Sequence, residues 1–231
     1  MATDLTTERD AALLVPHHVA ALHVARIAYS NPTIPDNLRR MTPMLTQVAG
    51  LILPDEPVAA MYFACTSASV VIGEGAVVKA IQAAKPGVPV VTPASAAVEG
   101  FAALGVKRVA LVTPYTRATT QPMVGFFEDQ GLHVIAASCL DLEDDRDMAR
   151  VCAQTIIDAA IAADCPEADG IFLSCTGLPA LGVIDTLEER LGKPVVSSNQ
   201  AALWKLLSCA QLEPAQRVGR LFKTCTPEAQ S

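Results

Sequence analysis

The sequence contains few aromatic side chains, few histidines and no long apolar run. Aromatic residues make up only 4% of the 231 residues, although 51% are hydrophobic. The core must therefore consist mainly of Ala, Val, Leu and Ile, which suits helices packed closely on parallel strands. No apolar run reaches the roughly 18 residues that a membrane span requires. The polar first ten residues do not have the pattern of a signal peptide, and we expect a cytoplasmic protein that does not contact membranes.

Basic clusters and cofactor motifs are also missing. The net charge of −7 carries no positive patch, which argues against a nucleic-acid partner. Neither a G-x-G-x-x-G nor a Walker sequence occurs. The seven cysteines include no Cys-x-x-Cys pair and the four histidines form no zinc pattern, so we expect reduced thiols, no metal and no cofactor.

Short apolar runs alternate with amphipathic stretches along the whole chain, which predicts βαβ units and parallel sheets. The expected strands are Ala20–Tyr29, Met61–Cys65, Val88–Val91, Arg108–Val112, His133–Ala137, Gly170–Ser174 and Pro194–Val196. Helical spacing predicts one helix from about Arg146 to Ala163, with Asp144 or Asp145 as its N-cap. Another helix carries Leu181 to Leu191 and is stopped by Gly192.

Two blocks of the chain resemble each other. Met61–Ser67 and Ile171–Gly177 each read as a buried strand that ends in Cys-Thr and a small residue. Each block is followed by a helix and then by a matching strand start, Gly87–Thr92 in one case and Gly192–Ser197 in the other. The same order at similar spacing indicates an internal duplication.

The duplication predicts two pseudo-symmetric, flavodoxin-like (Rossmann-like) parallel-sheet domains. We assign residues 1–93 plus 197–231 to the first and residues 94–196 to the second. The first half has one strand fewer, because Ala2–Asp4 stands where Thr113–Tyr115 follows a strand in the second half. Either the first half is a three-stranded variant or the chain begins one strand late. We favour the second interpretation, because a missing strand would leave an uncovered sheet edge.

Cys65 and Cys175 follow the carboxyl ends of equivalent strands, where sites form in open α/β sheets. Each is expected to precede a helix start, whose free N–H groups and positive dipole would lower the thiol pKa. Thr66, Ser67 and Thr176 add hydroxyl donors, and the same N–H groups would bind a substrate carboxylate. Two facing thiols would permit acid–base or nucleophilic catalysis. The alternative is that both cysteines only fill the core.

Other polar residues fall in loops at the same edge. Tyr115 would donate to a substrate carboxylate, or it is a surface-turn tyrosine. Asp4 and Asp145 are site candidates whose alternative role is helix capping, and Asn199 would orient a site group or cap the last helix. The remaining cysteines lack the symmetry of the first pair: Cys139, Cys152, Cys165, Cys209 and Cys225. Of these, Cys152 is expected in the core, on the apolar face of its helix.

The stretches Phe63–Ser67, Val112–Tyr115 and Leu173–Gly177 resemble the aspartate/glutamate racemase superfamily. The resemblance covers nearly the whole chain and is closest to the branch of maleate cis-trans isomerases and arylmalonate decarboxylases. Four further stretches resemble the ectoine-utilization protein A type within that branch: Ala2–Glu8, Ala25–Thr33, Pro35–Met41 and Ser67–Gly73.

The resemblance implies an active site between two facing α/β domains. It implies Cys65 as nucleophile or first base, Cys175 as the partner acid, and Tyr115 as a carboxylate ligand, with Gly177 in the binding loop. Decarboxylases of the branch keep one of the two cysteines, so the presence of both favours isomerisation or racemisation.

The expected partner is a small carboxylate, and the composition permits a homodimer. Asp4 and Asp145 align with asparagines of maleate isomerases and would repel a dianion. They favour a substrate that carries positive charge, such as an amino acid or an ectoine-derived compound. Maleate isomerisation and arylmalonate-type decarboxylation remain alternatives, and a bilobed binding protein is the non-enzymatic one.

Overall fold

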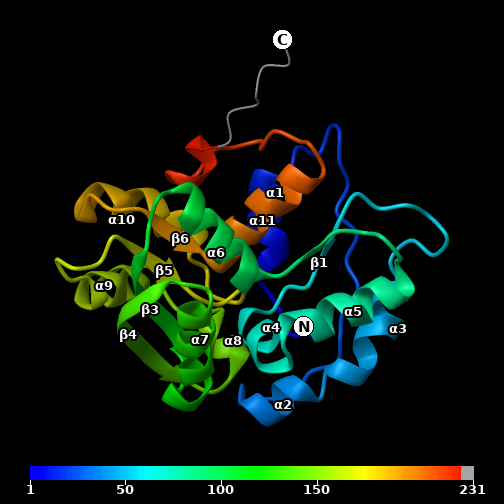
Figure 1. Cartoon of the computed structure of the whole chain (residues 1–231), viewed down its shortest axis with the longest axis horizontal. Helices are drawn as coiled ribbons and strands as arrows, with labels where there is room; N and C mark the ends of the chain where they lie inside the picture. Colours follow the sequence, from blue (N-terminus) through cyan, green and yellow to red (C-terminus); the bar gives the residue numbers. More distant parts are fainter. Residues whose placement is uncertain (225–231) are drawn as a thin grey trace.

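The second half of the chain forms a four-stranded parallel sheet in the order β4-β3-β5-β6 (Figure 1). The computed structural model describes residues 1–224. The strands are β3 (Arg108–Tyr115), β4 (His133–Leu142), β5 (Gly170–Leu173) and β6 (Val195–Ser197). Each lies at or near its predicted place, because a run of buried apolar residues bounded by Gly or Pro has few alternatives in an α/β protein.

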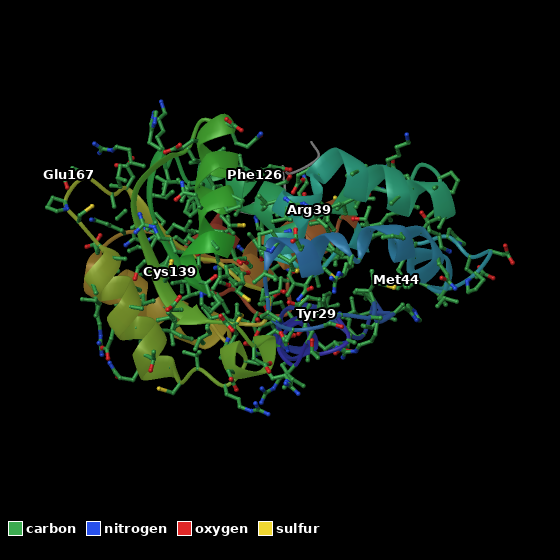
Figure 2. All side chains as sticks on the ribbon, turned by 90° about the horizontal axis from the view of Figure 1, so that it is seen from below. Tyr29, Arg39, Met44, Phe126, Cys139 and Glu167 are labelled. Carbon is green, nitrogen blue, oxygen red and sulfur yellow. The ribbon has the colours of Figure 1, made fainter. Side chains whose placement is uncertain are left out.

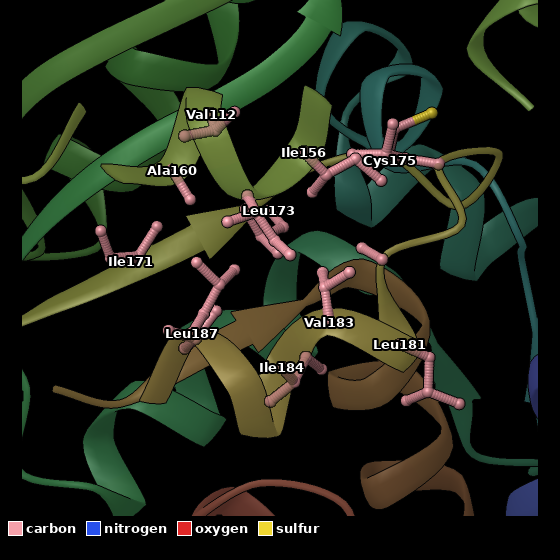
Figure 3. Packing of buried hydrophobic residues seen from close by; sticks show 14 of the residues in the cluster. Val112, Ile156, Ala160, Ile171, Leu173, Cys175, Leu181, Val183, Ile184 and Leu187 are labelled. Carbon is pink, nitrogen blue, oxygen red and sulfur yellow. The ribbon is translucent and has the colours of Figure 1, made fainter. Parts of the chain in front are cut away.

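Helices cover both faces of this sheet. On one face lie α6 (Pro93–Ala103) and α7 (Arg117–Asp129), and on the other lie α9 (Ala153–Ala163) and α10 (Ile184–Leu191). Figure 3 shows the tightly packed core between β5 and α10, with Ile171, Leu173 and Leu187 at its centre. Helix α10 ends at Gly192, which takes the left-handed conformation (φ 69°) that glycine tolerates best.

The first half contains a smaller sheet of two parallel strands, β1 (Met61–Tyr62) and β2 (Val90–Val91). Its helices are α2 (Pro35–Arg39), α3 (Leu45–Gly50), α4 (Thr66–Ile72) and α5 (Glu74–Ala84). They enclose a separate hydrophobic cluster that includes Leu38, Met41 and Val77. The expected α/β class with parallel sheets is confirmed.

Four shorter helical segments and two helices near the ends complete the described chain. They are α1 (Thr7–Leu14), η1 (Thr42–Met44), α8 (Asp145–Met148), η2 (Leu181–Val183), α11 (Ser198–Cys209) and η3 (Leu221–Lys223). Helix α11 packs against α6 of the second half and against α1 of the first. It therefore joins the two halves, and we retain the division into 1–93 plus 197–231 and 94–196 as a proposal. The end of that division, with Cys225, lies outside the described residues.

The strand expected at Ala20–Tyr29 is wrong. This segment is extended but forms no sheet ladder. The N–H of Ala2 donates to the carbonyl of Ile27 at 2.8 Å, and the Arg26 guanidinium donates to the carbonyl of Asp4. Apolar alternation alone does not make a strand, because a ladder needs a neighbouring strand to pair with.

The single helix expected from Arg146 to Ala163 is also wrong, because it is two helices, α8 and α9. Asp144 caps α8 as expected, accepting from the N–H of Arg146 at 2.9 Å. Cys152 has extended backbone angles (φ −75°, ψ 155°) and is the N-cap of α9. It is exposed rather than in the core, because a cap residue lies at the helix end and not on its packed face. Among the described residues, no helix is long and apolar enough to cross a membrane.

Candidate active site between the two halves

The two cysteines lie just beyond the ends of β1 in the smaller sheet and β5 in the larger one. Cys65 follows β1 and is the N-cap of α4, as predicted. Cys175 follows β5, but the residues after it form a turn and the next helical segment begins only at Leu181. The expected helix start behind Cys175 is therefore wrong. In Figure 3 its sulfur points away from the packed core of the second half.

The backbone at Cys175 is strained. Its φ of 144° is a value that residues with a side chain rarely adopt. Its N–H donates to the Ser198 hydroxyl at 2.9 Å, and its sulfur accepts from the N–H of Gly177 at 3.3 Å. Strained residues persist only where surrounding contacts hold them, and they cluster at functional sites. This strain is an independent sign that the position of the thiol matters.

Both thiols line one small enclosed cavity with a volume of about 10 Å³. Residues of both halves form its wall: Met1, Thr3, Asp4, Leu5, Thr33, Cys65, Ser67, Tyr115, Asp145, Met148, Ala149, Cys175, Thr176 and Gly177. The structure thus brings together all the candidate site residues from the sequence except Thr66 and Asn199, which lie outside the wall. Such a volume holds about one water molecule, so a substrate enters only if wall side chains move.

Thr66 lies behind the cavity and connects the two halves. Its hydroxyl donates to the Ser198 hydroxyl at 2.8 Å, and Ser198 in turn accepts from the N–H of Cys175. Thr176 makes a second connection, because its hydroxyl donates to the carbonyl of Ala64 at 3.3 Å. These buried hydrogen bonds hold the two strand ends, and hence the two thiols, next to each other.

Burial raises the pKa of both thiols, contrary to the expected thiolate character. For Cys65, burial outweighs the pKa-lowering effects of the Met1 amino group and of hydrogen bonds from the Ala68 N–H and Ser67. For Cys175, burial raises the pKa to about 12 despite a hydrogen bond from Tyr115. The expectation from the helix start considered the N–H donors that stabilise a thiolate. It did not consider that burial removes water from around the thiolate, which raises the pKa.

Tyr115 lies at the end of β3, fully enclosed rather than in a surface turn. Its hydroxyl hydrogen-bonds toward Cys175 and Ser67. Burial and the neighbouring thiols raise its pKa well above the usual value, so it is a neutral hydrogen-bond donor. A neutral phenol between two thiols is suited to hold a carboxylate oxygen of a substrate.

The Asp4 carboxylate faces the cavity and also caps α1. It accepts from the N–H groups of Thr6 (2.8 Å) and Thr7 (3.0 Å) and from the Thr7 hydroxyl (2.6 Å). The capping role that the sequence allowed is therefore present, together with a position on the cavity wall.

Asp145 belongs to the cavity wall and is only 4% exposed. It accepts from the Asn31 amide at 2.8 Å and from the Thr3 hydroxyl, while its neighbour Asp144 does the helix capping. Both hydrogen-bond donors, the Asn31 amide and the Thr3 hydroxyl, come from the first half of the chain. The acidic side of the cavity is therefore assembled across the two halves.

Sequence reasoning missed several residues of this region, among them Thr3, Asn31, Thr33 and Met1. Asn31 bridges Asp144 and Asp145, and Thr33, almost fully buried, accepts from the Tyr29 hydroxyl at 2.9 Å. Figure 2 shows Tyr29 near the middle of the molecule, beside the N-terminal segment. The Asn31–Thr33 stretch carries a loop signature, Asn-Pro, but nothing in it indicates which strand end it meets.

Met1 was also missed. Its sulfur lies 3.7 Å from the Cys65 sulfur. Its side chain occupies the wall of the same small cavity. Nothing in the sequence around Met1 indicates that its side chain contacts Cys65.

Asn199 orients groups of the site rather than capping α11, whose N-cap is Ser197 with a complete capping box. The Asn199 amide donates to the Asp10 carboxylate at 2.8 Å and to the carbonyl of Thr176 at 2.9 Å. It thus holds the loop that carries Thr176. Within residues 1–224, no cluster of His, Cys, Asp or Glu is arranged to hold a metal ion.

A family model described as arylmalonate decarboxylase matches residues 52–222. The chain belongs to the arylmalonate decarboxylase family. This confirms the branch of the superfamily that the cysteine motifs indicated. Relatives with two different names are similar to this chain.

The arylmalonate decarboxylase of Bordetella bronchiseptica is 38% identical over 140 residues, which span 59% of this chain and 58% of that enzyme. The maleate isomerase of Nocardia farcinica is 28% identical over 233 residues, spanning 96% of this chain and 92% of that enzyme. Among solved structures, a cysteine-to-serine mutant of the Nocardia farcinica maleate cis-trans isomerase, with a covalently bound succinylcysteine intermediate, superposes with a TM-score of 0.87 at 26% identity. That superposition covers 97% of this chain and 96% of the other.

Proposed function

We propose that the protein is an isomerase that uses Cys65 and Cys175 on a small carboxylate, and that maleate or a close analogue is its substrate. The observation that carries the proposal is that thiols from two equivalent strand ends line one enclosed cavity. A similarity to maleate isomerase over nearly the whole chain supports it, as does the covalent succinylcysteine intermediate of that relative.

In the proposed reaction, Cys65 first passes its thiol proton to the Asp4 carboxylate on the same cavity wall, from which the proton returns at the end of the cycle. The Cys65 thiolate then adds to one carbon of the double bond. A C–S bond forms, and the electron pair of the π bond moves to the neighbouring carbon, next to a carboxylate. That carbon takes the proton of the Cys175 thiol, which leaves Cys175 as a thiolate. After rotation about the resulting single bond, Cys175 removes a proton, the C–S bond breaks and the trans alkene leaves. Only protons and electron pairs are exchanged, so the reaction requires no cofactor.

The surroundings of Cys175 suit its role as the proton donor. Its pKa of about 12 keeps it protonated until the carbanion forms. The thiolate left afterwards is stabilised by the Gly177 N–H, 3.3 Å from the sulfur, and by Tyr115. Ser67 and Thr176 line the same wall and would bind the substrate carboxylate.

A second candidate is racemisation of an amino acid or an ectoine-derived compound, as in ectoine or hydroxyectoine catabolism. The observation that favours it is the pair of carboxylates, Asp4 and Asp145, on the cavity wall. An ammonium group would pair with them, whereas a dicarboxylate would be repelled. Here one thiolate would remove the α-proton and the opposite thiol would return one to the other face.

The test is proton NMR of the purified protein in deuterated water with maleate, with phenylmalonate and with L-amino acids including an ectoine-derived diamino acid. Four proteins are compared: wild type, Cys65→Ser, Cys175→Ser and, as a matched control, Cys152→Ser, whose thiol is exposed and outside the cavity. We expect wild type and Cys152→Ser to convert maleate to fumarate, and both site variants to lose at least about 10³-fold in rate.

Cys175→Ser should also accumulate an adduct on Cys65 with the mass of one substrate molecule, because its hydroxyl is a poor base for the reverse step. Deuterium exchange at an amino-acid stereocentre without maleate turnover would favour the second candidate. Release of carbon dioxide from phenylmalonate would show that the protein is a decarboxylase and would contradict the proposed isomerisation. Binding of a carboxylate with no turnover of any substrate would point to the non-enzymatic alternative.

A further inference from the structure

A buried chain of hydrogen bonds leads from helix α1 to the Cys175 sulfur. Asp10, on α1, lies outside the wall of the cysteine cavity and is only 7% exposed. Its carboxylate accepts from the Asn199 amide at 2.8 Å, and the same amide nitrogen donates to the carbonyl of Thr176 at 2.9 Å. Figure 1 shows α1 beside α11, the helix that carries Asn199. Burying a carboxylate is costly, and the proposed reaction gives Asp10 no part, so its place in this chain needs a reason.

The last link of the chain is a single peptide group. The carbonyl of Thr176 and the N–H of Gly177 belong to one peptide unit, which is planar and rigid. Asn199 holds the carbonyl end of this unit. At the other end, the N–H of Gly177 donates to the Cys175 sulfur at 3.3 Å. The hydrogen bond from Asn199 therefore sets the direction in which this N–H points.

Cys175 depends on such support. Its backbone is strained (φ 144°), and no helix start follows it to supply a row of free N–H groups. The groups that lower the pKa of its thiol are few: the Tyr115 hydroxyl and the N–H groups of Gly177 and Leu178. Helix α1 holds the same loop a second time, because the Thr6 hydroxyl donates to the carbonyl of Gly177 at 2.8 Å.

The orientation of the Asn199 amide depends on Asp10. Its nitrogen faces two acceptors, the Asp10 carboxylate and the Thr176 carbonyl. Its oxygen accepts from the Tyr62 hydroxyl at 3.2 Å. A flipped amide would point its oxygen at both acceptors, which is unfavourable as long as Asp10 is ionised and cannot donate. The Asp10 carboxylate thus selects the orientation in which Asn199 donates to Thr176.

The surroundings of Asp10 leave it ionised at mildly alkaline pH. Burial and the charge of Asp4 raise its pKa to about 6, while the Asn199 amide and the charge of Arg9 act in the opposite direction. Tyr62, which follows from β1, has a pKa well above its usual value because it is buried, so it is a neutral donor. At pH 8 Asp10 is therefore an anion that only accepts hydrogen bonds.

We infer that Asp10 is a positioning residue for the proton transfer at Cys175. It fixes the Asn199 amide, which holds the Thr176–Gly177 peptide so that its N–H stabilises the thiolate left when Cys175 gives up its proton. The consequence for catalysis rests on the proposed function. The consequence for the Cys175 thiol needs no substrate and is measured separately.

Four variants separate positioning from stability. Asp10→Ala removes the acceptor, whereas Asp10→Asn keeps an acceptor oxygen. Asn199→Asp puts a carboxylate against both acceptors. The double variant, Asp10→Asn with Asn199→Asp, restores a hydrogen bond between the two side chains, now donated by residue 10, but offers the Thr176 carbonyl no donor at pH 8. The matched control is Gln82→Glu, which also replaces an amide that donates to a backbone carbonyl, that of Val88, outside the cavity wall.

Three quantities are measured at pH 8. Peptide mass spectrometry follows the alkylation rates of Cys175 and Cys65 by iodoacetamide, and Cys65 is the internal reference. Urea denaturation gives the free energy of unfolding. The third quantity is kcat and KM for whichever of maleate, phenylmalonate and the amino acids the wild type turns over.

We expect Asp10→Ala, Asn199→Asp and the double variant to slow alkylation of Cys175 relative to Cys65 by about tenfold, because the thiolate loses a hydrogen bond. In the same variants kcat should fall at least about tenfold, with KM changed less than about threefold. Asp10→Asn and Gln82→Glu should stay within about threefold of wild type in both rates. The double variant should recover the stability that Asn199→Asp loses but not the reactivity, which a merely structural network would restore together.

An unchanged ratio of Cys175 to Cys65 alkylation in Asp10→Ala would overturn the inference. So would a double variant that recovers both stability and reactivity, or faster alkylation of both thiols, which would show only a loosened cavity. Should Asn199→Asp not fold, the comparison of Asp10→Ala with Asp10→Asn decides. If the wild type turns over none of the substrates, the proposed function fails, and the alkylation ratio still tests the role of Asp10.

Discussion

Asp10 makes the stability of the protein depend on pH in a direction opposite to that of most carboxylates. It lies on α1, is 7% exposed and accepts from the Asn199 amide at 2.8 Å. Burial raises its pKa from 3.8 to about 6, and the nearby Asp4 charge adds to this increase. The hydrogen bond from Asn199 and the charge of Arg9 offset only part of it.

The sign follows from which state holds the proton. Because the pKa is higher in the folded state, the folded protein binds a proton that the unfolded chain releases between about pH 4 and pH 6. The stabilisation is full below pH 4 and is lost as the pH rises through 6. A shift of about two units corresponds to roughly 3 kcal/mol, since each unit is worth about 1.4 kcal/mol.

The perturbation is Asp10→Asn, which keeps the shape and an oxygen to accept from Asn199 but cannot ionise. We expect the variant to be more stable than wild type by up to about 3 kcal/mol at pH 8, and by much less at pH 4. Urea denaturation at pH values from 4 to 8 measures the difference. The matched control is Asp36→Asn, whose carboxylate is exposed and pairs with Arg39. A difference for Asp10→Asn that is constant over the pH range would refute the reasoning.

Three further predictions concern the frame and the thiols. Gly219→Ala should destabilise the protein by about 2 kcal/mol, measured by thermal denaturation, because φ is 69° and an added Cβ would lie 2.7 Å from the Ile184 side chain. Ser197→Ala should lower the free energy of unfolding, measured by urea denaturation, by about 1 kcal/mol, because it removes the capping box of α11. Ser197→Thr should retain most of this stabilisation, because threonine keeps the hydroxyl. Iodoacetamide at pH 7 should label the exposed Cys152, whose pKa the Thr155 hydroxyl lowers, before Cys65 and Cys175. Peptide mass spectrometry that found either buried thiol modified first would contradict this order.

The sheet of the second half could be predicted from sequence because its strands are buried on both faces. Continuous apolar runs such as Gly170–Leu173 leave little choice of structure. The Ala20–Tyr29 segment is also rich in apolar residues but has no strand to pair with. Composition does not reveal which segments lie beside it in the folded protein. The break between α8 and α9 was missed for a related reason. Met148 and Ile156 are buried in the same hydrophobic cluster at helical spacing, and this spacing does not reveal the break at Cys152, which has extended backbone angles.

The sequence by itself determined that two strands end in Cys-Thr at equivalent places, which was enough to locate the cavity between the halves. Local sequence specifies strands, their order and their ends, because these depend on near neighbours along the chain. The tertiary structure decided the state of the site. It encloses both thiols, which raises the pKa of each, and it places Thr3 and Asn31 against Asp145, more than a hundred residues away. Burial and contacts between distant segments exist only after folding, and they set the protonation and orientation on which the chemistry depends.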